Sequence, residues 1–322
     1  MRQAGRYMQE YQNIRNNYDI LEIIKSPNLA TEVTLQPIKA YELDAAIIFA
    51  DILPILETMG LKLEFIENEG PVIHNPIRSL EDAVSLEIPE PINSMEFTLK
   101  AIKISRKCLD ERGIPLIGFS GAPFTLAYYA VEGRANKNKL KLKSIMYSQP
   151  ETWHILMSKL AELSGKYLLA QAKAGAQVLQ VFDSWAGDLS PQDYREYVKP
   201  YTQRVFEIAK AANLPLIHFT TNTNGMLTDI RDAGGDIISV DWRIDIDKAA
   251  EILGDNVILQ GNLDPAALYA PWPELEKRTR YILDKMMDRK GFIFNLGHGI
   301  LKTTPTKNVK RMVNFIHEYT SR

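Results

Sequence analysis

The chain has 322 residues, 45% of them hydrophobic and 24% charged, a composition typical of a globular protein with a sizeable core. Lysine plus arginine (38) and aspartate plus glutamate (40) almost balance, which argues against a nucleic-acid-binding protein. The single cysteine, Cys108, excludes an internal disulfide and fits a reducing compartment. No apolar run reaches the length of a membrane span, and the N-terminus has no apolar signal core. We therefore expect a soluble cytoplasmic protein that binds no membrane.

Short apolar runs rich in β-branched residues recur along the chain, as buried parallel strands do. The seven runs cover residues 45–51, 114–123, 176–187, 214–222, 235–242, 256–265 and 291–299. Helical patterns are predicted in the gaps, at 150–175, 190–213, 245–254, 271–287 and 304–320. The charged run at 134–143 is predicted to be a solvated loop. This alternation of strands and helices predicts a parallel α/β sheet.

The apolar runs end in polar residues, which favours a barrel over an open sheet. These residues are Asp51, Ser120, Asp183, Ser184, Thr220, Asp241, Asn262 and His298. In a barrel all strand ends meet at one mouth, whereas an open sheet usually carries a glycine-rich phosphate turn, which is missing after the first run. We therefore predict a single domain over 1–322 that forms a (β/α)₈ TIM barrel. Because only seven strands are found, we expect a truncated first strand, which would precede Met1 and place Arg2 and Gln3 at its tip.

Three positions allow both a structural and a chemical interpretation. Asp51 is either a turn aspartate or a carboxylate at the barrel mouth, and the local pattern does not decide between them. Arg2 and Arg6 suit a solvated helix face or, through their guanidinium groups, a carboxylate or phosphate clamp. Taken alone, the two arginines fit the solvated face better.

Three further candidates follow predicted strands. Tyr129 is most simply a packing residue, and Ser184 a turn residue, since no G-x-S-x-G elbow surrounds it. His298 lies between two glycines in "NLGHG" (295–299), which favours a functional role because glycines allow a ligand or another backbone to come close. Neither a histidine–cysteine metal motif nor a nucleotide-binding loop is present, so chemistry without metal, nucleotide or covalent cysteine is expected.

Seven segments, in order and spread over nearly the whole chain, resemble the uroporphyrinogen decarboxylase family of the haem pathway. They are "MRQAGRYMQEY" (1–11), "TLQPIKAYELDAAIIFADIL" (34–53), "GFSGAPFTLAYYAVEG" (118–133), "GAQVLQVFDSWAG" (175–187), "VDWRIDID" (240–247), "LQGNLDPAALYA" (259–270) and "NLGHGI" (295–300). The resemblance implies a (β/α)₈ barrel, a homodimer with facing clefts, and decarboxylation of the four acetates of uroporphyrinogen III to coproporphyrinogen III without a cofactor.

The resemblance also implies a set of substrate-binding residues. These are Arg2, Gln3, Arg6, Arg15, Asp51, Tyr129, Ser184 and His298. Asp51 and Arg2 are the implied catalytic residues: the carboxylate would stabilise a protonated pyrrole, and the arginine would donate a proton. The lysine-rich segment at 137–143 is hypothesised to attract the polyanionic substrate.

Two alternatives remain open. A non-catalytic tetrapyrrole-binding protein would bind the porphyrinogen without releasing CO₂. Methyltransferases that share this barrel hold zinc through histidine and cysteine thiolates, and Cys108, alone in a helical context, fits that chemistry poorly.

Overall fold

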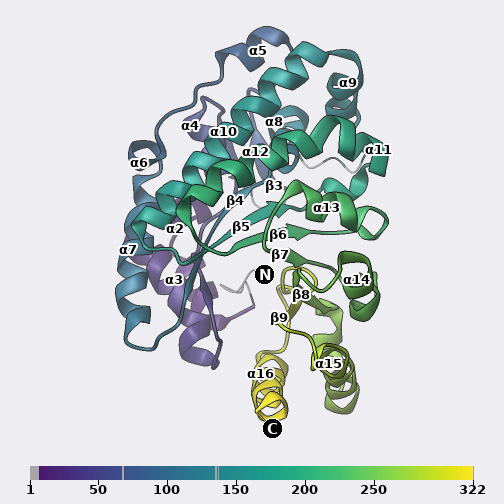
Figure 1. Ribbon diagram of the computed structural model, residues 1–322. Coiled ribbons are helices and arrows are strands. Elements are labelled where there is room, and N and C mark those ends of the chain that lie inside the picture. Colours follow the sequence, from purple (N-terminus) through teal and green to yellow (C-terminus); the bar gives the residue numbers. More distant parts are fainter. Residues whose placement is uncertain (1–6, 67–68, 135, 137, 322) are drawn as a thin grey trace.

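The computed structural model describes residues 7–66, 69–134, 136 and 138–321, and its centre is a curled sheet of parallel strands with helices around it (Figure 1). Each strand pairs in parallel with its neighbours in chain order. The strands are β1 (Ala46–Ile47), β4 (Leu116–Gly121), β5 (Val178–Asp183), β6 (Leu216–Thr220), β7 (Ile237–Ser239), β8 (Ile258–Leu263) and β9 (Phe292–Leu296). All seven lie within the apolar runs that predict strands.

The described sheet is a partly open barrel. Its edge strands are β1 and β9, and no hydrogen-bonded pairing closes the sheet between them within the described residues. The predicted α/β barrel is therefore confirmed in its parallel strands, their order and their curl. The eighth strand, expected before Met1, lies outside the described residues.

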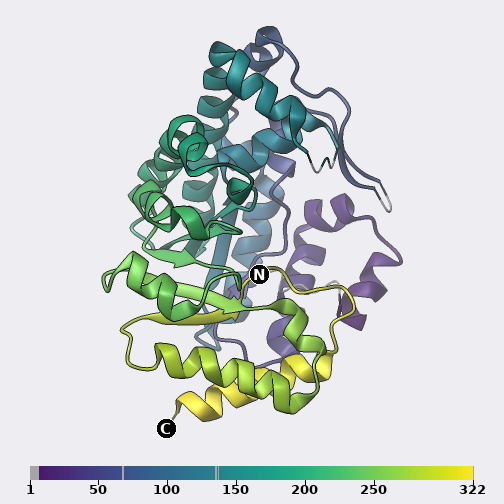
Figure 2. The ribbon, with the colours of Figure 1, turned by 90° about the vertical axis from the view of Figure 1, so that its right-hand side faces the viewer.

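Helices cover the outside of the curled sheet, and α10 packs beside α12, as α15 does beside α16 (Figures 1 and 2). Their bounds are α1 (Gln9–Arg15), α2 (Ile20–Lys25), α3 (Pro27–Ala40), α4 (Pro54–Thr58), α5 (Leu80–Ser85), α6 (Pro91–Ser94), α7 (Glu96–Asp110), α8 (Pro123–Glu132), α9 (Leu140–Ser148), α10 (Pro150–Ala174), α11 (Pro191–Asp193), α12 (Lys199–Ala209), α13 (Leu227–Ala233), α14 (Ile246–Leu253), α15 (Trp272–Met286) and α16 (Thr306–Thr320). In the described part of the chain, no helix is both long enough and apolar enough to cross a bilayer.

The helix predictions are confirmed at four of their five positions, within two residues at each end. The exception is 190–213, where the π-helical turn η2 (Tyr194–Val198) separates α11 from α12. Pro200 lies one residue into α12 and has no N–H to donate to the preceding turn, so regular α-helical bonding cannot continue through it.

Two features differ from the sequence prediction. The segment 134–143 is not entirely a loop, since α9 begins at Leu140 and buries Leu142, Ile145 and Met146. An antiparallel hairpin of β2 (Leu63–Ile66) and β3 (Gly70–Ile73), which was not predicted, lies outside the main sheet.

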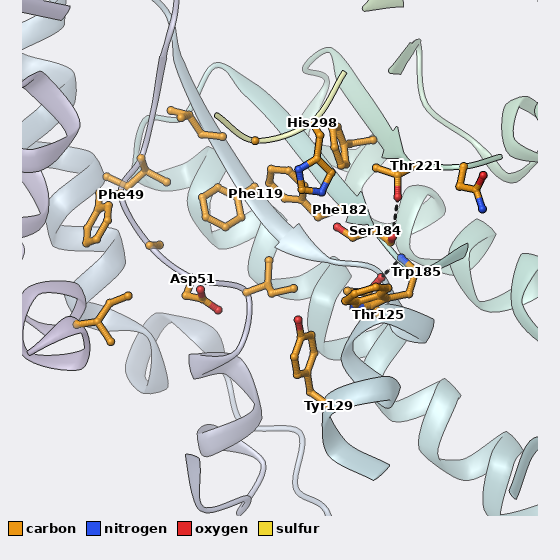
Figure 3. A pocket seen from close by; sticks show the side chains of 18 of the residues that line it. Phe49, Asp51, Phe119, Thr125, Tyr129, Phe182, Ser184, Trp185, Thr221 and His298 are labelled. Atoms are coloured by element: carbon orange, nitrogen blue, oxygen red, sulfur yellow. Dashed lines mark hydrogen bonds between the residues drawn. The ribbon is translucent and has the colours of Figure 1, made fainter. Parts of the chain in front are cut away.

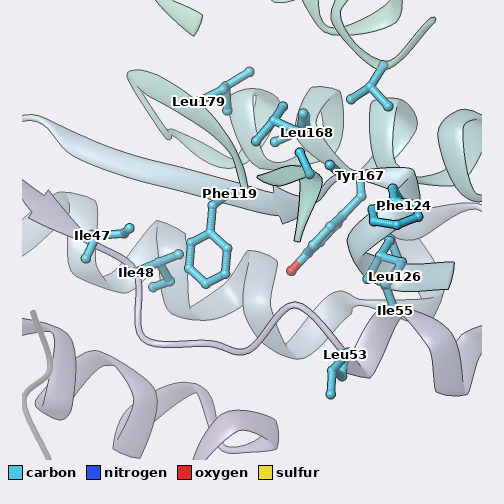
Figure 4. Packing of buried hydrophobic residues seen from close by; sticks show 14 of the residues in the cluster. Ile47, Ile48, Leu53, Ile55, Phe119, Phe124, Leu126, Tyr167, Leu168 and Leu179 are labelled. Atoms are coloured by element: carbon cyan, nitrogen blue, oxygen red, sulfur yellow. The ribbon is translucent and has the colours of Figure 1, made fainter. Parts of the chain in front are cut away.

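The apolar core is continuous from Met8 to Met312, and on this basis we propose that 1–322 forms one domain. Figure 4 shows its centre, where side chains of β1 and β4 meet residues of α10 such as Tyr167. Burial in this core raises the pKa of Tyr167. The large aromatic and aliphatic groups bury much apolar area, the main favourable contribution to folding.

A buried glutamine on α10 completes the hydrogen bonding of β4 beside the short strand β1. The Gln171 amide accepts from the Phe119 N–H (2.9 Å) and donates to the Phe119 carbonyl (2.7 Å), and the side chain is fully buried. It thus makes the two bonds that a neighbouring strand would have made. Since Phe119 also faces the cavity described below, this bond pair helps to fix the cavity wall.

We expect Gln171→Leu to lower the free energy of unfolding by about 3 kcal/mol, because it leaves two buried backbone groups unsatisfied at about 1–3 kcal/mol each. Chemical denaturation measures the loss. Lys173→Leu, at an exposed position of the same helix, is the control and should change stability by no more than about 0.5 kcal/mol. A loss for Gln171→Leu no larger than that of the control would contradict this account.

Candidate active site

A cavity of about 500 Å³ opens at the carboxyl ends of the strands, within the roughly 300–1,000 Å³ usual for small-molecule sites. Its walls are mostly apolar and aromatic, with polar groups between the rings. The lining residues are Tyr11, Ile20, Ile47, Ile48, Phe49, Ala50, Asp51, Ile52, Phe119, Thr125, Tyr129, Phe182, Ser184, Trp185, Asp188, Phe219, Thr221, Asn222, Arg243, His298 and Gly299. Four predicted site residues, Asp51, Tyr129, Ser184 and His298, therefore meet around one cavity.

Asp51 lies between β1 and α4, and its carboxylate points into the cavity among aromatic side chains (Figure 3). Its Oδ1 accepts a hydrogen bond from the Leu53 N–H at 3.0 Å. The turn role considered for this residue is thus present, and the same side chain also lines the cavity. Asp51 is half-buried among these rings, which replace part of the water around its charge, so the charge acts more strongly than it would in bulk solvent.

Tyr129 is carried by α8, which starts directly after β4 with Pro123 in its first turn. Its hydroxyl points toward the cavity from the side opposite Phe119 and Phe182 (Figure 3). The ring packs edge-on against Tyr128, with centroids 4.8 Å apart. The tyrosine is therefore half-buried in packing while its polar end faces the site.

The loop after β5 is bonded to neighbouring elements on both sides. The Thr221 hydroxyl donates to the Ser184 carbonyl at 2.8 Å, and the Trp185 N–H donates to Thr125 Oγ1 at 3.4 Å (Figure 3). Gly187 lies so close to the next loop that a Cβ there would be 2.2 Å from the Thr221 carbonyl oxygen. Only glycine fits at this contact between the loops after β5 and β6.

His298 is exposed at the cavity mouth, with its ring 6.3 Å from that of Phe219. The sequence suggested that the glycines beside His298 allow either a ligand or another backbone to come close. For Gly297, the glycine before it, the structure shows the close approach of another backbone. A Cβ on Gly297 would be 2.8 Å from the backbone nitrogen of Trp242. The glycine after it, Gly299, lines the cavity.

The remaining predicted site residues have different outcomes. Arg2, Gln3 and Arg6 lie outside the described residues. Arg15 is half-buried at the end of α1, donates to the Tyr18 carbonyl, and is not among the residues lining the cavity. From the same helix Tyr11 does line the cavity, so the segment after the N-terminal motif forms part of the wall.

Sequence reasoning missed Arg243, Asp188 and Thr221 as cavity residues. Arg243 follows the end of β7 directly after Trp242, and it lay within a segment that the family resemblance had already marked. The rule that polar residues after strand ends meet at the barrel mouth could have found it.

Lys139 supports the cavity wall from behind. Its ammonium group lies 4.2 Å from the centre of the Trp185 ring and 5.0 Å from that of Tyr128, and it forms an ion pair with Asp188. Burial also raises the pKa of Tyr128. Only 3% of Lys139 is exposed, so the expectation of a solvated segment is wrong here. The aromatic faces and the carboxylate replace the water that its charge would otherwise require.

Comparison with known proteins places the chain in a family. The family model described as "Uroporphyrinogen decarboxylase (URO-D)" matches residues 1–319. The uroporphyrinogen decarboxylase of Roseiflexus sp. (strain RS-1) is 49% identical over 100% of this chain and 93% of the relative. That of Carboxydothermus hydrogenoformans is 50% identical over 100% of this chain and 91% of the relative.

The chain belongs to the uroporphyrinogen decarboxylase family. Solved structures with the same fold include a methyltransferase from Methanosarcina mazei (TM-score 0.77, 22% identity, 94% of this chain and 90% of that chain). A B12-independent methionine synthase from Shewanella sp. W3-18-1 has a TM-score of 0.59 and 12% identity, covering 94% of this chain and 89% of that chain. At these identities the two structures show a shared fold alone.

We expect Lys139→Met to lower the free energy of unfolding by about 2 kcal/mol. Removing one partner of a fully buried pair costs about 3–5 kcal/mol, and the loss is smaller here because 39% of the Asp188 side chain is exposed. Lys141→Met, at an exposed position two residues on, is the matched control and should be nearly neutral. Equal denaturation midpoints for the two variants would show that the buried contact contributes nothing.

Proposed function

We propose that this cavity binds uroporphyrinogen III and removes the carboxyl groups of its four acetate side chains, giving coproporphyrinogen III. Family membership supports the reaction, and the relatives do not support a non-catalytic binder or a methyltransferase. The observation that carries the mechanism is a carboxylate, Asp51, inside a cavity walled by aromatic rings.

The reaction needs a sink for electrons. A proton added to a pyrrole α-carbon makes the ring a cation. The bond between the acetate methylene and its carboxyl carbon then breaks, CO₂ leaves, and the electron pair neutralises the ring. The methylene carbon takes up a proton to become a methyl group, and the α-carbon loses the proton it gained, so each CO₂ released consumes one proton.

Asp51 suits the stabilisation of that cation. Its fixed negative charge is already oriented by the bond to the Leu53 N–H, so little reorganisation is needed when the pyrrole becomes charged. The pyrrole N–H groups can donate hydrogen bonds to this carboxylate. The surrounding rings of Phe49, Phe119 and Phe182 lower the local dielectric and offer flat apolar surfaces to the pyrroles.

The polar residues around Asp51 suit the carboxylates of the substrate. The Tyr129 and Ser184 hydroxyls and the His298 ring can donate hydrogen bonds to acetate or propionate groups. Following the family resemblance, we assign further carboxylate binding to Arg2, Gln3, Arg6 and Arg15, and the proton donation to Arg2. Arginine is a very weak acid, so an adjacent carboxylate or water would have to assist that transfer.

We also propose that the enzyme acts in the cytoplasm as a homodimer with facing cavities. The family resemblance supports the dimer, and the exposed thiol of Cys108 fits a reducing compartment. Light scattering of the purified chain should give the mass of two chains, and a mass of one chain at micromolar concentration would contradict the dimer.

The role of Asp51 can be tested with Asp51→Asn, which keeps an oxygen that can accept from the Leu53 N–H but removes the charge. We expect kcat for decarboxylation to fall about 100- to 1,000-fold, the usual effect of removing a group that stabilises a developing charge. The melting temperature should stay close to that of the unmodified chain.

Asp44→Asn provides the control, because Asp44 is an exposed carboxylate paired with His317 outside the cavity. Its kcat should match that of the unmodified chain. If Asp51→Asn retained kcat within about threefold, Asp51 would be a turn residue only.

A further inference from the structure

Arg243 is held rigidly at the cavity wall by its two preceding neighbours. Its guanidinium carbon lies 4.4 Å from the centre of the Trp242 ring. Its backbone N–H donates to Asp241 Oδ1 at 2.9 Å, and its Nη1 forms an ion pair with Asp241 Oδ2. The side chain is 44% exposed while that of Asp241 is 1% exposed, so the arginine extends from a buried anchor toward the cavity.

The anchor leaves part of the guanidinium able to bind a ligand. Asp241 contacts the guanidinium through Nη1 and also accepts from the Asn222 N–H at 2.6 Å. Within the described part of the chain, no hydrogen bond is formed by Nε or Nη2 of Arg243. These two nitrogens form one edge of the guanidinium fork, the arrangement that binds a carboxylate through two parallel hydrogen bonds.

Arg243 and Asp51 line the same cavity but follow strands that are not neighbours in the sheet. Asp51 follows β1, and Arg243 follows β7, which is separated from β1 by three strands in the sheet. A ligand that reaches both residues must be broad and must carry an anion far from its reacting group. Uroporphyrinogen meets this requirement, since each of its four pyrrole rings bears carboxylate side chains.

The charges on the wall near Arg243 favour the same ligand. Asp188 and Asp241 would repel a polyanion, but each is paired with a cation, Lys139 and Arg243 respectively. Among the described residues that line the cavity, Arg243 is the only lysine or arginine. Arg243 is therefore the one permanently cationic side chain that the described wall offers to the substrate, and Asp241 engages only its Nη1.

We propose that Arg243 binds a carboxylate of uroporphyrinogen on a pyrrole ring remote from the ring at Asp51. The inference rests on the proposed decarboxylase function and adds a substrate-binding residue to it. Because this contact is made away from the reacting acetate, it lowers the energy of bound substrate and transition state alike and acts on KM rather than kcat.

Steady-state kinetics of Arg243→Gln under anaerobic conditions test the proposal. We expect KM for uroporphyrinogen III to rise about 10- to 100-fold, the effect of losing a charge-assisted hydrogen bond, with kcat within about threefold. Arg243→Lys keeps the charge but not the fork and should recover part of the loss. In Arg243→Gln, kcat/KM should also depend less steeply on salt, because one charge pair is missing.

Arg278→Gln is the matched control. Arg278 lies on α15, is paired with one carboxylate, Glu274, and is 57% exposed, but it does not line the cavity. Its KM and salt dependence should equal those of the unmodified chain.

Two results would overturn the proposal while the unmodified chain still forms coproporphyrinogen. One is a KM for Arg243→Gln within twofold of normal. The other is a loss of kcat and melting temperature together with an unchanged salt dependence, which would make Arg243 a support for the Asp241 loop alone. An unmodified chain that forms no coproporphyrinogen would instead refute the proposed function.

Discussion

Parallel pairing of the seven strands is the constraint on which the site depends. Because every strand runs in the same direction, the residues after all their carboxyl ends lie at one edge of the sheet. The curl of the sheet turns that edge into the mouth of a cavity. Asp51 and His298 therefore line the same cavity although they are far apart in the sequence.

Contacts between successive loops then fix that edge. The loop after β5 bonds to the one after β6 through Ser184 and Thr221, and Asp241 bonds to Asn222 across the next gap. Gly297 packs directly on the backbone after β7. The loops after β5, β6, β7 and β9 thus form a connected rim whose polar groups are held in place by these contacts, which reduces the cost of ordering them during the reaction.

Local sequence rules were sufficient for the strands and for the polar residues that end them, whereas the assignment of Tyr129 and Ser184 to the site came from the family resemblance. A buried strand is a short apolar run, and a polar residue such as Asp51 or Ser184 marks where it ends. The pattern was insufficient where a residue's role depends on partners far along the chain. Lys139 resembled a solvated lysine because its partners Trp185 and Asp188 lie more than 40 residues away, and only the fold brings them together.

Arg243 shows a different limit. The sequence shows that Arg243 follows a strand. Its role depends on how Trp242 and Asp241 orient the guanidinium, and composition does not reveal these contacts. The N-terminal arginines were identified through resemblance to the family, and their place in the site stays a prediction.

The structure places a carboxylate oriented by the Leu53 N–H inside an aromatic-walled cavity, and in the proposed mechanism this carboxylate stabilises a cation formed on the substrate itself. The most direct test is anaerobic incubation of the purified chain with uroporphyrinogen III, followed by oxidation and mass spectrometry of the porphyrins. We expect progressive loss of four CO₂ molecules and accumulation of coproporphyrin. Uroporphyrin recovered unchanged, from a protein that binds it, would contradict the account.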